Sequence, residues 1–305
     1  MPCRDMARMA ETTFSAVDLS RLPAPDIIEA LDFETILADA VARMQALMPT
    51  FENRDSDPAT KLLQLFSYVA QLLRQRVNDA VRAVMPAYAV GADLDNIAAL
   101  FGIMRLTITP ADVGLGIPAI MESDADFRRR MVLAPEGYSV AGPAGAYIFH
   151  ALSAHPDVLD ASATSPNAGE VLLSVLSRTG SGQASPDVIE AVRAYASHET
   201  RRPLTDQVTA QSAQIIEYAV AATITTFSGP DGTVVRAAAR AGLEDFVTSS
   251  HKLGRDITRS GLFAALHVPG VQNVVLAEPA ADIIVSRTQA PYCTAITIAD
   301  AGTGE

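Results

Sequence analysis

The sequence is poor in several residue types that build familiar functional sites. Only two cysteines, Cys3 and Cys293, occur in 305 residues. This is too few for a disulfide framework, and their spacing is not that of a metal site. So little cysteine is typical of a chain made in a reducing, cytoplasmic compartment. Basic residues are also scarce, with 23 Lys and Arg against 35 acidic residues and a net charge of −12. This balance argues against nucleic-acid binding, which usually requires a basic surface.

Long apolar runs are missing as well. No stretch approaches the roughly 20 apolar residues needed to cross a bilayer. The first residues, MPCRDMARMAETTF, lack the continuous apolar core of a secretory signal. The apolar content of 49% is ordinary for a globular protein, and the length suffices for two or three domains. Residues 1–60 carry 11 acidic and 5 basic residues, which suits either a solvated acidic face or a docking surface for a basic partner.

The longest regular pattern lies between Asp57 and Met85 and predicts one amphipathic helix about 40 Å long. Asp57 is a good N-cap, Pro58 suits the first helical position, and Pro86 stops the helix. Apolar residues recur every three or four positions on one face, namely Leu62, Phe66, Val69, Leu73, Val77, Ala80 and Val84. Polar residues form the opposite stripe, namely Gln64, Ser67, Gln71, Arg74, Gln75, Asn78 and Arg82. Helices of this kind are common in bundles between subunits.

We therefore predict that this helix forms an interface with other chains. The candidate apolar contacts are Leu62, Phe66, Val69, Leu73 and Val77. The candidate charged members are Arg74, Arg76 and Asp79, and Asp79 has Arg76 and Arg82 one turn away on either side. Which side of this face meets its own domain and which meets another chain stays open.

The order of patterns predicts an α+β fold, with an N-terminal helical region followed by two small α/β domains that have mixed or antiparallel sheets. An earlier helix has its own buried face, formed by Phe33, Ile36, Leu37, Ala40, Val41, Met44 and Leu47. The expected organisation is a flexible N-terminus (1–13), a helical region (14–106), a linker with a short helix (107–136), a middle α/β domain (137–214) and a C-terminal α/β domain (215–305). Hairpins are expected from Val158–Ala163 with Glu170–Leu176, and from Val271–Ala277 with Asp282–Ser286.

This organisation includes a possible hinge and a possible internal repeat. The segment Thr107–Ile120 is rich in Gly and Pro and has no periodicity, which predicts a loop. We hypothesise that this loop is a hinge. A helix, a Pro-x-Val sequence and a hairpin follow Phe149 and again Phe263, and true duplication and coincidence explain this equally well.

Motifs for catalysis or ligand binding are weak. Gly114-Leu115-Gly116 lacks the third glycine of a dinucleotide loop, and Thr179–Gly182 lacks the glycine spacing of a nucleophile elbow. The chain has five histidines, namely His150, His155, His198, His251 and His267. No two of them have the i,i+4 spacing that would suggest a metal site. The sequence thus predicts no catalytic residue, no cofactor site and no metal site.

The remaining charged motifs have structural interpretations. The acidic pairs Asp55/Asp57, Asp93/Asp95 and Asp124/Asp126 begin predicted helices, where carboxylates cap free N–H groups. Arg128-Arg129-Arg130 could bind phosphate, but a solvated or intersubunit charge patch is the favoured interpretation.

A family resemblance emerges from residues along nearly the whole chain. Its densest part comprises Asp57-Pro58, Lys61-Leu62-Leu63, Tyr68, Leu73–Ala80, Tyr88-Ala89, Gly91–Asp95 and Leu100–Gly102. Further parts are Leu22–Pro25, Leu31–Phe33, Glu122–Asp124, Arg128–Arg130, Ala134–Glu136, Gly145–Tyr147, Phe149–Leu152, Arg202–Asp206, Leu253–Ile257 and Arg259-Ser260. In this order they resemble the baseplate J-like proteins of contractile-tailed phages and phage-tail-like bacteriocins. The residues before Phe14 are the main departure.

The resemblance implies a structural wedge protein of a contractile injection system, with no catalytic residues and no cofactors. It implies a homodimer with a second copy of itself, and a helical core bundle shared with a smaller tail baseplate protein. A lysozyme-like wedge protein and the central spike and hub are further implied partners, whereas nucleic acid and membrane are not. The chain would be made in the bacterial host cytoplasm and would reside in the tail baseplate of a phage or tailocin.

Two alternatives remain. A hydrolase-type enzyme on the α/β domains would gather His, Ser or carboxylate side chains in one pocket. A nucleic-acid or DNA-packaging protein would present a coherent basic face.

Overall fold

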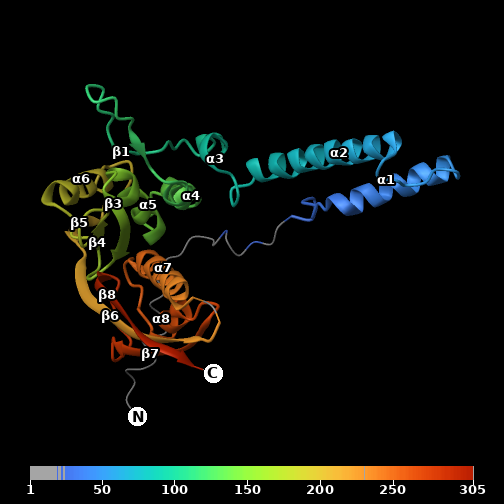
Figure 1. The fold of residues 1–305 in the computed structure, drawn as a ribbon. Helices are drawn as coiled ribbons and strands as arrows, with labels where there is room; N and C mark the ends of the chain where they lie inside the picture. The colour runs from blue at the N-terminus through green and yellow to red at the C-terminus, as the bar shows by residue number, and fades with distance from the viewer. Residues whose placement is uncertain (1–18, 20–21, 23–24, 230, 305) are drawn as a thin grey trace, which may run out of the picture. The chain divides into compact units, whose positions relative to one another are not determined.

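The structure, a computed structural model, describes residues 19, 22, 25–229 and 231–304. They form two compact units, and the boundary falls between Met104 and Arg105. The first unit is helical, and the second holds two three-stranded sheets with their helices, so the predicted α+β class is confirmed (Figure 1). The predicted flexible N-terminus, residues 1–13, lies outside the described residues, and the other predicted domain boundaries stay predictions.

The helical unit contains α1 (Phe33–Leu47), α2 (Pro58–Ala83) and α3 (Gly91–Ala99). Helix α1 begins where the Asp32 carboxylate accepts a hydrogen bond from Thr35 N at 2.9 Å. Helix α1 packs beside α2 (Figure 1). The predicted buried face of α1 is half-buried in the structure except at its end, where Leu47 is exposed. The helix prediction is confirmed for both elements, but α2 ends before Met85.

A short hairpin arm opens the second unit, where the sequence predicted a loop. Strands β1 (Thr107–Thr109) and β2 (Ile120–Met121) pair antiparallel, with an isolated bridge nearer the tip. The strands are too short to show an alternating pattern, which is why the prediction missed them. At the base, Glu122 N donates to Leu106 O at 2.8 Å. The loop prediction is therefore wrong, because the two ends of the segment are bonded to each other, and the hinge hypothesis stays a prediction.

The middle sheet is built from residues after the arm. Its elements are α4 (Asp124–Leu133), the 3-10 helix η3 (Ala134–Tyr138), α5 (Ala144–Ala154), β3 (Val158–Thr164), β4 (Glu170–Ser177), α6 (Pro186–Ala196) and β5 (Gln207–Ser212). Strands β3 and β4 form the predicted antiparallel hairpin, and β5 lies parallel to β4. Helices α5 and α6 supply Tyr147 and Val192 to a core with Leu173 of β4.

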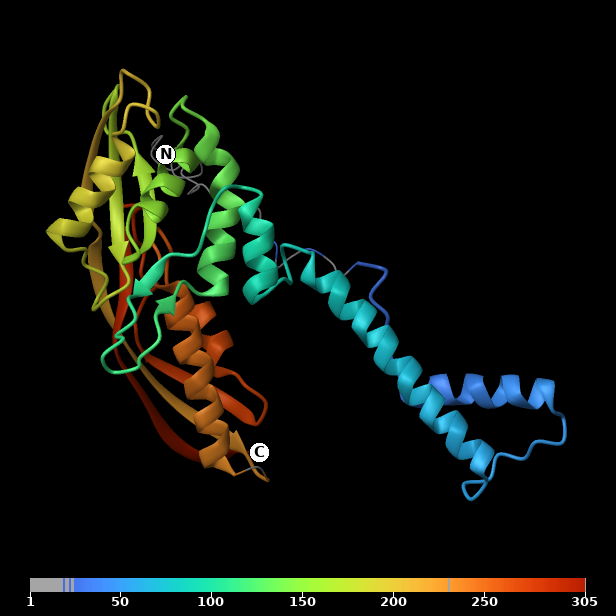
Figure 2. The same ribbon diagram turned by 90° about the horizontal axis from the view of Figure 1, so that it is seen from above.

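The C-terminal sheet has the order β7-β6-β8. Its elements are β6 (Gln214–Phe227), α7 (Gly232–Ser250), α8 (Arg259–Leu266), β7 (Val271–Glu278) and β8 (Gln289–Gly304). Helix α7 lies along this sheet (Figure 2) and contributes Val235, Ala239 and Leu243 to its core.

The second predicted hairpin is wrong. Strand β7 pairs with β6, and Ile283 makes only an isolated bridge to Ile257. The Asp282–Ser286 run instead lies against the segment that leads into α8, where the Asp282 carboxylate accepts from Arg259 N at 2.7 Å. The hairpin of the proposed repeat is therefore missing after Phe263.

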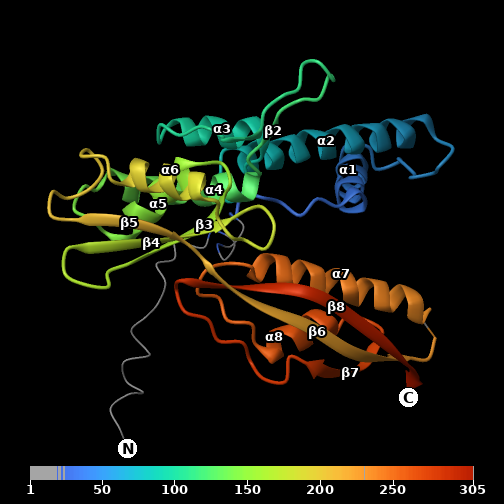
Figure 3. The same cartoon turned by 90° about the vertical axis from the view of Figure 1, so that its left-hand side faces the viewer.

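One extended stretch of chain passes through both sheets, because Ala213 alone separates β5 from β6 (Figure 3). A small core of Leu176, Ala213, Leu253 and Ala290 closes the junction. Two hydrogen bonds cross it, from Ser162 Oγ to Arg287 O at 2.6 Å and from Leu253 N to Asp160 Oδ2 at 3.0 Å. The two sheets are therefore joined through backbone, apolar and polar contacts together.

Candidate protein–protein interface

The predicted apolar face of α2 is exposed in the helical unit. Leu62, Phe66 and Leu73 are 67%, 65% and 64% exposed, and Val69 and Val77 are also exposed. Leu65, Leu72 and Val84 widen the same patch. A contiguous exposed apolar surface of this kind marks a site of contact with another molecule.

The polar stripe of α2 is the side that meets the chain's own structure, a question that the sequence left open. Ser67 and Asn78 are buried. The Asn78 side-chain amide donates to Glu29 O at 2.9 Å and accepts from Glu29 N at 3.1 Å. Here small and amide side chains meet the preceding segment of the same chain, which leaves the apolar face open.

The charged members of the candidate interface have partners within the chain. Arg74 forms an ion pair with Glu29 at 2.6 Å. Asp79 accepts a hydrogen bond from Gln75 at 2.7 Å and lies 3.7 Å from Arg82. The structure thus brings Arg74 and Asp79 to the borders of the apolar face, and Arg76 is exposed nearby. Exposed pairs of this kind contribute at most about 1 kcal/mol to stability.

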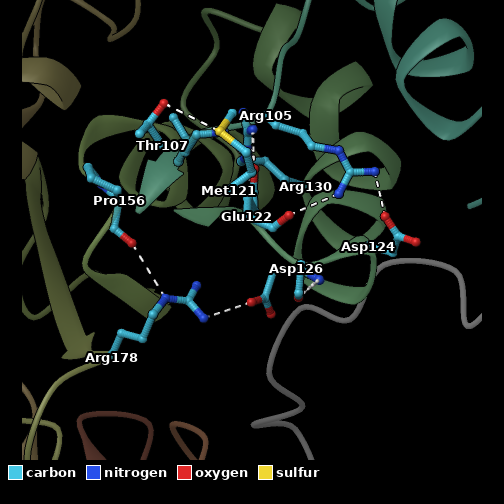
Figure 4. Close-up of polar contacts among 11 residues, drawn as sticks. Arg105, Thr107, Met121, Glu122, Asp124, Asp126, Arg130, Pro156 and Arg178 are labelled. Carbon is cyan, nitrogen blue, oxygen red and sulfur yellow. Dashed lines mark hydrogen bonds and ion pairs between the residues drawn. The ribbon is translucent and has the colours of Figure 1, made fainter. Parts of the chain in front are cut away.

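The arginine run on α4 is not the solvated or intersubunit patch that the sequence favoured. Arg130 and Glu122 are both 5% exposed, and the guanidinium donates to the two carboxylate oxygens at 3.1 and 2.6 Å (Figure 4). Arg129 pairs with Asp160. The interpretation is wrong for these two residues, because their charges are neutralised inside the chain.

Helix α4 is the centre of a wider ion-pair cluster, formed by Arg105, Glu122, Asp124, Asp126, Arg129, Arg130, Asp160 and Arg178. Arg105 pairs with Asp124 at 2.5 Å, and Arg178 pairs with Asp126 at 2.7 Å (Figure 4). The cluster ties the base of the hairpin arm and the β3–β4 hairpin to one helix.

The capping interpretation of the acidic pairs is confirmed only in part. Asp57 caps α2 through a bond from Ala59 N at 2.8 Å. At α4, Ser123 is the N-cap and accepts from Asp126 N at 3.2 Å, so the carboxylates of Asp124 and Asp126 are available for ion pairs.

The weak ligand motifs gain no support from the geometry. The Asp112 carboxylate accepts from Gly114 N and Leu115 N, which occupies N–H groups that a phosphate would need. His150 is buried, and burial, then the nearby Arg201 charge, lowers its pKa to about 4. Among the described residues, no group of three or more His, Cys, Asp or Glu side chains could hold a metal ion.

The sequence missed a second exposed apolar feature, the tip of the hairpin arm. Val113, Leu115 and Ile117 are 91%, 75% and 51% exposed. A signal was present, because Asp112 is the only charged residue between Thr107 and Met121. A surface loop would ordinarily carry more charge.

Three family models and one relative of known name show the family to which the chain belongs. Residues 55–112 match the baseplate J-like N-terminal domain, 139–212 the central domain and 218–299 the C-terminal domain. The chain is 48% identical over 299 residues to "Baseplate protein J" of Escherichia phage P2, covering 95% of this chain and 99% of that protein. A cryo-EM structure of the anti-feeding prophage baseplate aligns with 58% of this chain and 44% of its own, at 14% identity and a TM-score of 0.40. Within the described part of the chain, no helix is long and apolar enough to span a membrane.

Proposed function

Because the chain belongs to the baseplate J-like family and is a structural protein of the phage tail baseplate, we propose that it is a wedge protein assembled through the apolar face of α2. The proposed partners are a second copy of the chain and a smaller tail baseplate protein that shares a helical core bundle with it. A lysozyme-like wedge protein and the spike and hub complete the proposed surroundings, in a phage or a tailocin.

The observation that carries this proposal is the division of α2 into two faces. Buried polar contacts, such as those of Asn78 with Glu29, hold α2 to its own chain. The leucine, phenylalanine and valine side chains face away from these contacts and are exposed. Burying apolar surface contributes about 25 cal/mol per Å². Another chain that covered this exposed face would therefore be bound by the hydrophobic effect.

We also propose that the protein acts without catalysis. The charged side chains that cluster around α4 are engaged in ion pairs with one another. The buried His150 lies against Phe149 and Tyr195, with no nucleophile among its ring contacts. These contacts support a structural role and give the hydrolase alternative no specific observation in its favour.

The test is Leu73→Asp or Val77→Asp in a phage or tailocin that depends on this chain. An unpaired carboxylate buried at a helix interface costs several kcal/mol, so the variant chain should be lost from assembled baseplates. Leu73 is largely exposed in the isolated chain, so the purified variant should keep the helix content and thermal midpoint of the original protein.

Leu204→Asp is the matched control, because Leu204 is 93% exposed and lies in the other compact unit. The control should enter particles normally. Incorporation of the Leu73 and Val77 variants at the original level would show that the α2 face is not an assembly interface.

A further inference from the structure

Strand β8 has a long open edge. It pairs with β6 on one side, and no strand of the described residues pairs with its other side. The start of this outer edge is covered, because Gln289 O accepts from Gly254 N at 2.9 Å and Pro291 O lies 2.6 Å from His251 Nδ1. The edge is open from Thr294 to Gly304. Unpaired backbone N–H and C=O groups in such a row are a template for another strand.

Between the two register shifts of β8, which lie opposite Tyr218/Ala219 and Ile224/Thr226, this edge lacks the features by which proteins protect open strands. The stretch Thr294–Gly304 contains no lysine and no proline. Its one charged residue, Asp300, is held by Arg236 and by a bond from Gly302 N at 2.8 Å. From Ala295 to Asp300 the ladder with β6 runs without a register shift. Charge, proline and bulges are the usual protections, so this segment is regular and free to pair.

We propose that the outer edge of β8 pairs antiparallel with the same edge of a second copy, joining the two C-terminal sheets into one. This inference rests on the proposed assembly with a second copy and names the strand through which the copies meet. It concerns the unit after Arg105, and it is separate from the α2 face.

The side chains select one register for this pairing. Opposite residues in an antiparallel pair share a face of the sheet. In a symmetric pair of identical strands, the two-fold axis must therefore lie between two copies of the same residue. An axis at Thr297 places Ile296 opposite Ile298 of the second copy, and both isoleucines pack on the α7 side of the sheet. An axis at Asp300 would oppose two carboxylates, and an axis at Ile298 would set Asp300 against Ile296. The Thr297 register therefore matches apolar with apolar residues, which makes the edge complementary to itself.

Cysteine cross-linking tests this register. In the full chain with Cys3→Ser and Cys293→Ser, Thr297→Cys would bring two thiols opposite each other, with Cβ atoms about 4.5–5.5 Å apart. A short bifunctional thiol reagent should then give a covalent dimer. Ala277→Cys is the matched control, because Ala277 is also exposed and lies on β7, at the other edge of the same sheet. We expect at least tenfold more dimer from Thr297→Cys than from Ala277→Cys.

A charge substitution gives an independent measurement. Thr297→Lys would place two ammonium groups opposite each other, which opposes pairing, whereas Ala277→Lys leaves the β8 edge unchanged. Both positions are exposed, so both variants should keep the original circular dichroism spectrum. Sedimentation equilibrium should show that Thr297→Lys self-associates at least tenfold more weakly than the original chain, whereas Ala277→Lys self-associates as the original chain does.

The outcomes separate this inference from the proposed function. Equal cross-linking at positions 277 and 297, in the purified chain and in assembled particles, would overturn the β8 pairing even if the chain is present in baseplates. Specific cross-linking at position 297 with no incorporation of the chain into baseplates would support the pairing and overturn the proposed function.

Discussion

Replacing Glu122 with alanine would remove the carboxylate that accepts two hydrogen bonds from the buried Arg130 guanidinium. In the protein Glu122 accepts two bonds from Arg130 and a third from Leu106 N at 3.1 Å. Removing one member of a buried ion pair costs about 3–5 kcal/mol, mainly because the other charge stays buried. For a unit of roughly 200 residues, each kcal/mol lowers the melting temperature by about 2–4 °C. We therefore expect a fall of roughly 6–20 °C.

Circular dichroism is the suitable measurement, because the chain has no tryptophan. Two controls sharpen it. Glu190→Ala breaks an ion pair that is largely exposed on α6, so it should cost no more than about 0.5 kcal/mol. The double change Glu122→Met with Arg130→Met removes both charges and keeps similar volumes, so it should recover most of the lost stability.

Two results would contradict the expected effect of Glu122→Ala. A Glu122→Ala variant that melts within 2 °C of the original protein would mean that water reaches Arg130 and that the pair is not truly buried. A double variant no more stable than the single one would mean that the loss comes from the orphaned Leu106 N–H or from repacking, and not from an unpaired charge.

Three further predictions follow from other contacts. The pKa of buried His150 is lowered to about 4, whereas the same histidine in the unfolded chain has an ordinary pKa near 6.5, so the unfolded chain binds more protons between pH 6.5 and 4. The free energy of unfolding should therefore fall by up to about 3 kcal/mol as the pH falls across this range. A His150→Phe variant should lack this pH dependence in chemical denaturation. Gly182→Ala would place a Cβ 2.5 Å from Leu176 Cδ1 at a φ of +100°, so thermal melting should show a loss of about 1–3 kcal/mol. Asn78→Ala removes both bonds to the Glu29 backbone, so amide hydrogen exchange around Glu29 should accelerate, consistent with a loss of about 1–3 kcal/mol; unchanged exchange would contradict the importance of these bonds.

Local signals in the sequence predicted the helices and one hairpin well. Asp57 and Pro58 mark the start of α2, and the β3–β4 hairpin lies where alternating residues and a turn predicted it. These features depend on residues that are close together in the sequence, so the local sequence alone is enough to predict them.

Features that depend on distant partners could not be predicted in the same way. Nothing near Arg129 in sequence shows that its charge is paired, because its partner Asp160 lies 31 residues further along the chain. The Asp282–Ser286 run has the apolar character of a strand but finds its partners near Asp256 and Arg259. The use of the polar stripe of α2 within the chain was hidden for another reason, since a single sequence does not say which face meets which chain.

The strand that runs from Gln207 to Phe227 has a mechanical consequence. A load applied along it at the middle sheet passes to the C-terminal sheet through one covalent backbone, with β4 beside its first part and β8 beside its second. Because the load acts along the strand, the flanking hydrogen bonds carry it in shear and share it, whereas a peeling force would break them one at a time. The continuous strand therefore resists extension, so that a displacement of one sheet along the strand moves the other sheet by nearly the same distance.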